Sequence, residues 1–259
     1  MKISIIGTGK AATALTTAFI AAGQEVVQAW AHSRESGNEY ADRFGLDVVY
    51  STENWIPGSD VVIVALRDDV VQEVLSQFSF GKEVVALTSG IQSRTILDPF
   101  SAFNGIFYPF VSMTKTTSVN FSEAVMMIEG NSEMAVRKLS ELAHRLSQRV
   151  MLKSEQERRV LHVAAVISQN FTNHLWVIAS QLLEQHELQF DLLKPLLQEH
   201  FEQVLQHDPR KLQTGPAVRG DQATIAIHRK LLSAHSDWLR VYDALTLSIQ
   251  ENKNNASNL

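Results

Sequence analysis

Short apolar runs alternate with amphipathic stretches along the first half of this 259-residue chain. Continuous apolar runs are typical of parallel strands that are buried on both faces. Such runs occur at 2–6, 25–31, 47–50, 60–66, 83–87, 105–108, 124–128 and 150–153. Helical periodicity occupies intervals between them, at 10–22, 39–44, 70–78 and 132–147. This alternation predicts an α/β domain built on a doubly wound, mostly parallel sheet.

The strand patterns stop after about Ser154, and only helical patterns follow. They cover 155–184, 192–205, 222–234 and 236–250. The first of these helices is apolar on most sides, so we interpret it as buried. The sequence therefore predicts an α/β domain at 1–153, an all-helical domain at 154–251 and a flexible tail at 252–259.

The opening stretch, MKISIIGTGKAATALTTAFIAAG, fits two interpretations. A signal peptide needs an unbroken apolar segment after its positive start, and residues 7–10 (GTGK) interrupt that segment. The alternative is a strand, a glycine turn and a helix, in which residues 7–12 match the G-x-G-x-x-A pattern of dinucleotide-binding turns. Gly7 would permit the tight turn, Gly9 would let the backbone approach a pyrophosphate, and Ala12 would let the helix pack closely on the strand. We predict cofactor binding by Gly7, Thr8, Gly9, Lys10, Ala11 and Ala12, with a turn that binds no ligand as the alternative.

The end of the second predicted strand bears on which dinucleotide binds. NAD-binding turns place an acidic residue about 20 positions after the glycine pattern, where it holds the ribose 2′-hydroxyl. Here that count reaches His32, and the neighbours Ser33 and Arg34 suit a 2′-phosphate, because arginine binds phosphate through two parallel hydrogen bonds. We predict NADP, with NAD as the alternative. Leu66, Arg67 and Asp68 follow another buried strand, and we expect them to flank the cofactor.

Composition excludes several classes of function. The chain has no cysteine, which rules out disulfides, thiolate metal sites and a cysteine nucleophile. Its net charge of −5 gives no indication of a nucleic-acid partner, and no apolar run reaches the roughly 18 residues of a membrane span. The histidines lack the spacing of metal ligands, and the G-x-S-x-G pattern of serine hydrolases is missing. We expect a cytoplasmic protein without a metal site.

Polar side chains gather at the carboxyl ends of the later predicted strands. Ser89, Tyr108 and Ser112 follow two such strands, so we expect them at one edge of the sheet. The long helix carries a polar stripe with His162, and Asn170 lies further round it. Histidine is the side chain that exchanges a proton near neutral pH, which makes His162 a candidate acid. Satisfied core polar groups or subunit contacts are the alternative interpretation of the stripe.

Several motifs together resemble one known family. They are GTGKAA at 7–12, LTSG at 87–90, YP at 108–109, the run from His162 to Asn170, and TGPAVRGDQATIAIH at 214–228. The chain resembles bacterial Rossmann-like proteins with a C-terminal domain of unknown function 2520, which are labelled NADP oxidoreductases. That family is similar to pyrroline-5-carboxylate reductase and, more distantly, to the 6-phosphogluconate and β-hydroxyacid dehydrogenases. The resemblance implies a Rossmann sheet and a helical domain that commonly dimerises, and it implies no substrate.

The chain departs from these relatives at three positions. Leu87 and Tyr108 stand where the family often has histidine. The β-hydroxyacid dehydrogenases use a lysine four residues before an asparagine as acid and base, and Val166 stands four residues before Asn170 here. Valine cannot move a proton, which argues against β-hydroxyacid chemistry by that mechanism.

The function we predict is NADP-dependent hydride transfer to or from a small, polar, anionic substrate in the cleft between the two domains. The candidate catalytic residues are His162, Asn170 and Ser89, and Ser89 is also a candidate cofactor contact. Tyr108, Ser112 and Arg219 are candidate substrate contacts, with Arg219 suited to an anionic group. We expect a homodimer formed through the helical domain. The alternative is a dinucleotide-binding sensor or interaction protein that has kept the fold and lost catalysis.

Overall fold

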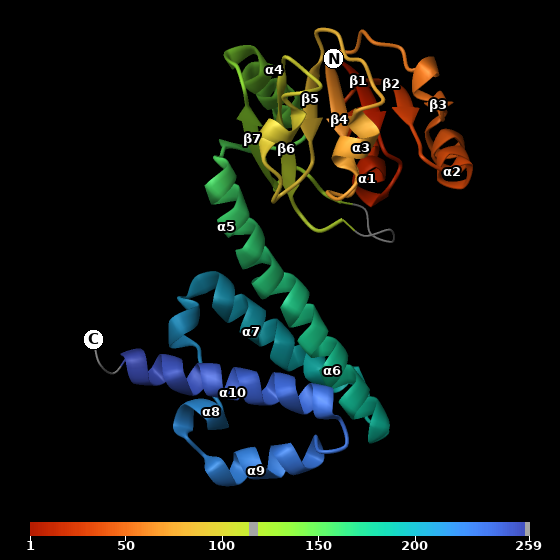
Figure 1. Ribbon diagram of the computed structural model, residues 1–259. Helices are drawn as coiled ribbons and strands as arrows, with labels where there is room; N and C mark the ends of the chain where they lie inside the picture. The colour runs from red at the N-terminus through yellow and green to blue at the C-terminus, as the bar shows by residue number, and fades with distance from the viewer. Residues whose placement is uncertain (114–118, 257–259) are drawn as a thin grey trace. The chain divides into compact units, whose positions relative to one another are not determined.

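The computed structural model describes residues 1–113 and 119–256. It divides into two compact units, Met1–Ile167 and Ser168–Leu259 (Figure 1). The first contains a sheet with its helices, and the second is helical. The predicted boundary at 153/154 lies just before a helix whose contacts group it with the sheet. The roles assigned to the two predicted domains stay predictions.

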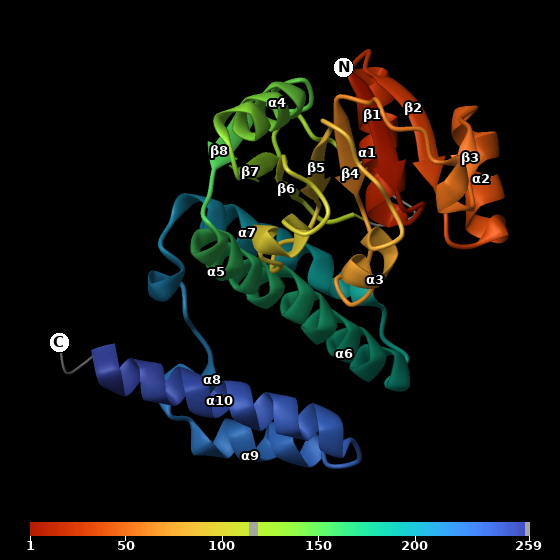
Figure 2. The same cartoon turned by 45° about the horizontal axis from the view of Figure 1, so that its top comes forward.

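Within the described residues, the first unit contains one sheet in the order β3-β2-β1-β4-β5-β6-β7-β8 (Figures 1 and 2). Its strands are β1 (Lys2–Ile6), β2 (Glu25–Trp30), β3 (Val48–Val49), β4 (Val61–Val64), β5 (Val84–Leu87), β6 (Asn104–Phe110), β7 (Val125–Gly130) and β8 (Arg149–Leu152). Strands β1 to β6 are parallel to one another, whereas β7 is antiparallel to β6. The predicted doubly wound, mostly parallel sheet is confirmed, and β1 to β6 end at one common edge.

Helices and apolar side chains cover both faces of this sheet. The helices are α1 (Lys10–Ala21), α2 (Arg34–Phe44), α3 (Val71–Leu75), α4 (Glu133–His144) and α5 (Glu155–Ala165), with short 3₁₀ helices η1 (Thr52–Asn54) and η2 (Arg94–Leu97). One apolar cluster joins α1 and α4 to the sheet, and a second joins α3 and η2 to it. The run Val61–Val64 is buried throughout, because its alternate side chains enter the two clusters.

Helix α2 begins earlier than the periodicity predicts. We expected it at 39–44, but it starts at Arg34, because the Ser33 hydroxyl accepts a hydrogen bond from the Ser36 N–H and caps the helix. It ends at Gly45, whose left-handed φ of 64° is typical of a residue that follows a helix. Ser33 and Arg34 therefore lie at a helix start directly after β2.

The predicted long helix at 155–184 contains an interruption. A π-helical turn, η3 (Val166–Phe171), separates α5 from α6 (Thr172–Gln185). The expectation that this helix is buried is wrong for one side of it: Val160, Val163 and Ile167 are 64%, 55% and 57% exposed. The side of α5 that faces the sheet carries polar groups instead, which leaves the apolar side outward.

The second unit is helical throughout its described residues. Its remaining elements are η4 (Phe190–Leu193), α7 (Lys194–Gln206), η5 (Pro209–Lys211), α8 (Pro216–Arg219), α9 (Gln222–Leu231) and α10 (Ser236–Ala256). Asp221 caps α9 by accepting a hydrogen bond from the Thr224 N–H. Helix α10 continues through most of the predicted tail, and residues 257–259 lie outside the described residues. None of the helices in the described part is long and apolar enough to cross a membrane.

Candidate functional site

The first glycine of the GTGKAA turn has a role in the fold itself. Gly7 follows β1, and its N–H donates to the carbonyl oxygen of Trp30 at 2.9 Å. Its φ is +109°, a conformation that side chains rarely adopt. A Cβ atom at this position would also lie 2.5 Å from the carbonyl oxygen of Ala65. The turn from β1 towards α1 therefore requires glycine at position 7.

The second glycine has no such role. Gly9 has an ordinary φ of −78°, and a Cβ atom there would meet no atom of the described residues within 4 Å. It directly precedes α1, a helix without a side-chain cap and without an acidic residue in its first turn. Ala12, by contrast, is fully buried against the sheet. The close approach of an anionic group to the N–H groups that begin α1 would explain why position 9 lacks a side chain.

Hydroxyl groups link this turn to the end of β2. The Thr8 hydroxyl donates to the Ser36 Oγ at 3.1 Å, and the Ser36 and Ser33 hydroxyls are 2.8 Å apart. The Arg34 guanidinium lies over the Tyr50 ring, 5.0 Å from its centroid. His32 is exposed beside them. Sequence reasoning missed Ser36, and its position three residues after Ser33 at a helix start is the signal that could have identified it.

The residues after β4 flank the same turn in part. The Leu66 side chain would lie 3.2 Å from a Cβ atom at Gly7, so it contacts the turn closely. The exposed Arg67 forms an ion pair with Asp69 at 2.5 Å. The backbone carbonyl of Asp68 accepts a hydrogen bond from the Gln92 side chain at 3.4 Å. Leu66 and Asp68 therefore face neighbouring loops of the sheet edge, whereas Arg67 is held by a surface partner.

Tyr108 and His162 meet at this edge, although 54 residues separate them. The Tyr108 hydroxyl and the His162 Nδ1 are 3.1 Å apart. Both side chains press against Gly90, where a Cβ atom would lie 2.5 Å from the His162 Nδ1 and 2.9 Å from the Tyr108 hydroxyl. Burial raises the pKa of Tyr108 above its ordinary value of 10. We call this pair the Tyr–His dyad.

The other predicted site residues are distributed around or away from the dyad. The Ser89 Oγ accepts hydrogen bonds from the N–H groups of Ile91 and Gln92, at 3.2 and 3.0 Å, and so shapes the loop beside Gly90. Ser112 is exposed, two residues after β6. Asn170 lies on the π-helical turn η3 and Arg219 ends α8; both are exposed and belong to the second unit.

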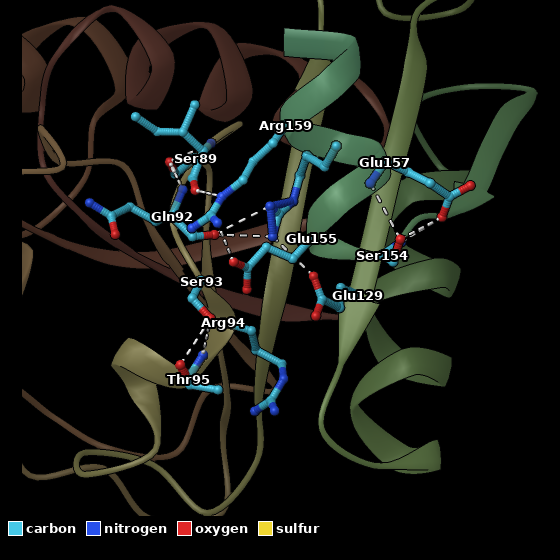
Figure 3. A network of polar contacts seen from close by, with 12 residues as sticks. Ser89, Gln92, Ser93, Arg94, Thr95, Glu129, Ser154, Glu155, Glu157 and Arg159 are labelled. Carbon is cyan, nitrogen blue, oxygen red and sulfur yellow. Dashed lines mark hydrogen bonds and ion pairs between the residues drawn. The ribbon is translucent and has the colours of Figure 1, made fainter. Parts of the chain in front are cut away.

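A buried arginine completes the surroundings of the dyad, and sequence reasoning missed it. The Arg158 guanidinium donates to the Gln92 carbonyl oxygen at 3.1 and 3.2 Å and to the Glu129 carboxylate at 3.0 Å. Its neighbour Arg159 donates to the Ile91 carbonyl oxygen at 2.8 Å. Figure 3 shows Gln92 and Glu129 beside the first turns of α5. The spacing in the sequence is the signal that could have identified Arg158, because it lies one helical turn before His162 and therefore on the same face of the helix.

This arrangement can bind an anion and move a proton. The glycine turn, the uncapped start of α1 and the hydroxyls at the start of α2 provide donors for phosphate groups. The Tyr–His dyad provides a hydroxyl that can donate a proton and an imidazole that can replace it. No cluster of metal-ligating side chains occurs among the residues that the structure describes.

Comparisons with known families agree with this description of the chain. Residues 2–90 match the family model described as NADP oxidoreductase coenzyme F420-dependent. Residues 124–249 match the domain of unknown function 2520. None of the curated proteins matches the chain.

Solved structures resemble the chain over nearly its full length. A "putative NADP oxidoreductase" from Bacteroides fragilis is 31% identical, with 96% of this chain and 98% of that one covered and a TM-score of 0.89. A Thermotoga maritima protein is 19% identical, with 97% and 99% covered and a TM-score of 0.79. A 1-pyrroline-5-carboxylate reductase from Streptococcus pyogenes is 14% identical, with 97% and 98% covered and a TM-score of 0.62, and it shares the fold. The chain therefore belongs to the NADP oxidoreductase family that carries the domain of unknown function 2520.

Proposed function

We propose that the protein is an NADP-dependent oxidoreductase that transfers hydride to or from a small, polar, anionic substrate. Gly9 carries the proposal, because no contact with the described residues explains its missing side chain, whereas a bound pyrophosphate would. Family membership supports the same class of reaction. The residues present fit the cofactor: donors surround the start of α1, and no acidic residue occurs in its first turn.

When bound, the nicotinamide cofactor supplies or accepts the hydride, which carries two electrons. The protein must then provide a proton for the heteroatom of a reduced substrate. Tyr108 O–H is the donor in this proposal, and the His162 imidazolium returns a proton to the resulting phenolate across the 3.1 Å between Oη and Nδ1. Reversal of these transfers serves oxidation. Ser89 acts on the loop beside the dyad through its two hydrogen bonds to backbone N–H groups.

Ser112, Asn170 and Arg219 stay predictions as substrate or catalytic contacts. Arg219 is exposed at the end of α8 and suits an anionic group of the substrate. The homodimer and the cytoplasmic location are also part of the proposal.

The choice of NADP can be tested by calorimetric titration with NADPH and then with NADH. We expect selective NADPH binding. We expect Arg34→Ala to weaken it about tenfold or more, because a hydrogen-bonded charge on the 2′-phosphate is lost. NADH affinity should change little in this variant.

Arg43→Ala is the matched control for this titration. Arg43 is exposed in the last turn of the same helix and lies over the Phe44 ring, so the variant removes the same charge at the other end of α2. Equal losses of NADPH affinity in Arg34→Ala and Arg43→Ala would contradict a specific role of Arg34. Absence of binding of either cofactor would contradict the proposed function.

A non-catalytic dinucleotide sensor is the second candidate, favoured by Val166 where β-hydroxyacid dehydrogenases have the catalytic lysine. Turnover assays with a panel of imines, ketones and alcohols, with NADPH or NADP⁺, distinguish the two. Turnover that depends on Tyr108 and His162 supports the enzyme, and tight cofactor binding without any turnover supports the sensor.

A further inference from the structure

Among the described residues, Arg158 has the largest side chain that is fully buried. Its two terminal nitrogens bind one backbone carbonyl, that of Gln92, and one of them also contacts Glu129. Its Nε is buried and has no hydrogen-bond partner among the described residues. Burial lowers the pKa of the guanidinium, and the nearby Glu129 carboxylate opposes that effect.

Such a pair is costly to bury and poorly explained by stability alone. Taking the guanidinium fully out of water consumes much of its attraction to the Glu129 carboxylate, which is 24% exposed, and apolar side chains of similar size often stabilise a protein equally well. The unpartnered Nε adds to the cost. An explanation therefore has to come from what the guanidinium does to its neighbours.

Those neighbours form the loop on which the dyad rests. Gln92, which accepts from Arg158 through its carbonyl, also donates from its N–H to the Ser89 hydroxyl and from its side chain to the Asp68 carbonyl. Gly90 lies between Ser89 and Gln92 and contacts both members of the dyad. Because Arg158 and His162 are four residues apart on α5, the bond to Gln92 fixes the face of the helix that carries His162.

The charge of Arg158 also acts on Tyr108. Burial opposes ionisation of the phenol, the Arg158 guanidinium favours it, and the Asp68 carboxylate opposes it. His162 faces the same hydroxyl, and Glu129, Glu155 and Arg159 act on Arg158 itself. The charge that favours ionisation of Tyr108 is therefore that of Arg158.

We propose that Arg158 is the positioning residue of the Tyr–His dyad. Anchored by Glu129 and the Gln92 carbonyl, it holds His162 against Tyr108 and stabilises the phenolate that remains after Tyr108 has given its proton to the substrate. This inference rests on the proposed function for its catalytic meaning, while its physical content is the placement of His162 through the Gln92 loop and the effect of the Arg158 charge on the Tyr108 hydroxyl.

The test is a pH titration of tyrosinate absorbance in the full-length protein without cofactor. Subtracting the curve of Tyr108→Phe from that of the wild type isolates Tyr108 from the other tyrosines. The same subtraction is made in each variant background. We expect Arg158→Met to shift the Tyr108 midpoint to higher pH, because the stabilising charge is lost. We expect Glu129→Gln to shift it to lower pH, because the guanidinium then acts without its counter-charge.

Arg159→Met is the matched control, since Arg159 is the next residue and binds the neighbouring carbonyl of the same loop with a half-exposed side chain. It should leave the Tyr108 midpoint nearly unchanged. An equal shift in Arg159→Met and Arg158→Met, or shifts of the same sign in Arg158→Met and Glu129→Gln, would overturn the proposal. If Arg158→Met does not fold, Arg158→Lys replaces it. Because Arg158→Lys retains the positive charge, its Tyr108 midpoint should stay near that of the wild type. The Tyr108 midpoint of Glu129→Gln should still be lower. If it is not lower, the proposal is overturned.

NADPH titration of the same proteins separates this inference from the proposed function. If the Tyr108 midpoint does not shift in opposite directions in Arg158→Met and Glu129→Gln while NADPH still binds, only the proposed role of Arg158 is contradicted. If the midpoint does shift in opposite directions but no NADPH binds, the electrostatic role of Arg158 is supported and the proposed NADP-dependent function is contradicted.

Discussion

Gly7 and Gly9 stand two residues apart and lack a side chain for different reasons. Gly7→Ala places a Cβ against the Ala65 carbonyl at a φ of +109°, so we expect a loss of about 1–3 kcal/mol of unfolding free energy. Gly9→Ala has room among the residues that the structure describes and an ordinary φ, so its stability should stay within about 1 kcal/mol of the wild type. NADPH affinity should nevertheless fall at least about tenfold in Gly9→Ala, because the methyl group occupies the approach of the pyrophosphate.

Urea unfolding and calorimetry on both variants check this prediction. A stable Gly9→Ala protein that binds NADPH as the wild type does would show that GTGKAA is only a turn. The glycine pattern could be predicted from sequence because Gly7, Gly9 and Ala12 each meet a local requirement: a tight turn, room for a pyrophosphate and close packing of the helix. The contact of Tyr108 with His162 could not, since only the register of β6 and the position of α5 bring them together.

At the scale of elements, the start of α5 decides where Arg158 and His162 lie. Ser154 and Glu157 form a capping box, and Lys153 also binds the Glu157 carboxylate at 2.7 Å. The hydrogen bond from Lys153 and those from Ser154 lower the pKa of Glu157 from an ordinary 4.5 to about 2. A carboxyl group with a lowered pKa in the folded state stabilises the fold above its unfolded pKa, and this contribution is lost as the pH falls.

We therefore expect the stability due to Glu157 to be complete above about pH 4.5 and to disappear as the pH falls towards about 2. Melting temperatures of the wild type and Glu157→Gln, measured across this window, should differ most at neutral pH and converge in acid. Glu39→Gln removes a charge at an exposed site of α2 and serves as the control. A constant difference at all pH values would contradict the prediction.

The same helix shows where sequence periodicity is insufficient. A continuous helix at 155–184 was a reasonable prediction, because an apolar pattern does not register the one extra residue per turn that defines a π-helix. The pattern also could not tell which side of α5 faces the sheet. Arg158 and His162 take that side through specific polar partners, so the side richest in valine and isoleucine is the exposed one.

At the scale of the whole molecule, large apolar side chains are exposed on helices of both units. At about 100° per residue, Val160, Val163 and Ile167 form a stripe on the side of α5 and η3 opposite to Arg158 and His162. In the described part of the second unit, large side chains are exposed as well, including Leu196 at 63% and Leu205 at 84%. Exposed apolar surface of this kind marks an interaction surface, and the predicted homodimer would cover it.

Sedimentation equilibrium should therefore give twice the 28.9 kDa of the chain at micromolar concentration. Val163→Asp should weaken the dimer about tenfold or more, because burial of a carboxylate replaces burial of an apolar side chain. Ile56→Asp is the control, since Ile56 is 72% exposed on the loop after η1, away from the helical stripe. A monomeric wild type contradicts the dimer. A dimer that survives Val163→Asp but dissociates in a Leu196→Asp protein would instead assign the interface to α7, because only burial at the interface makes a new charge this costly.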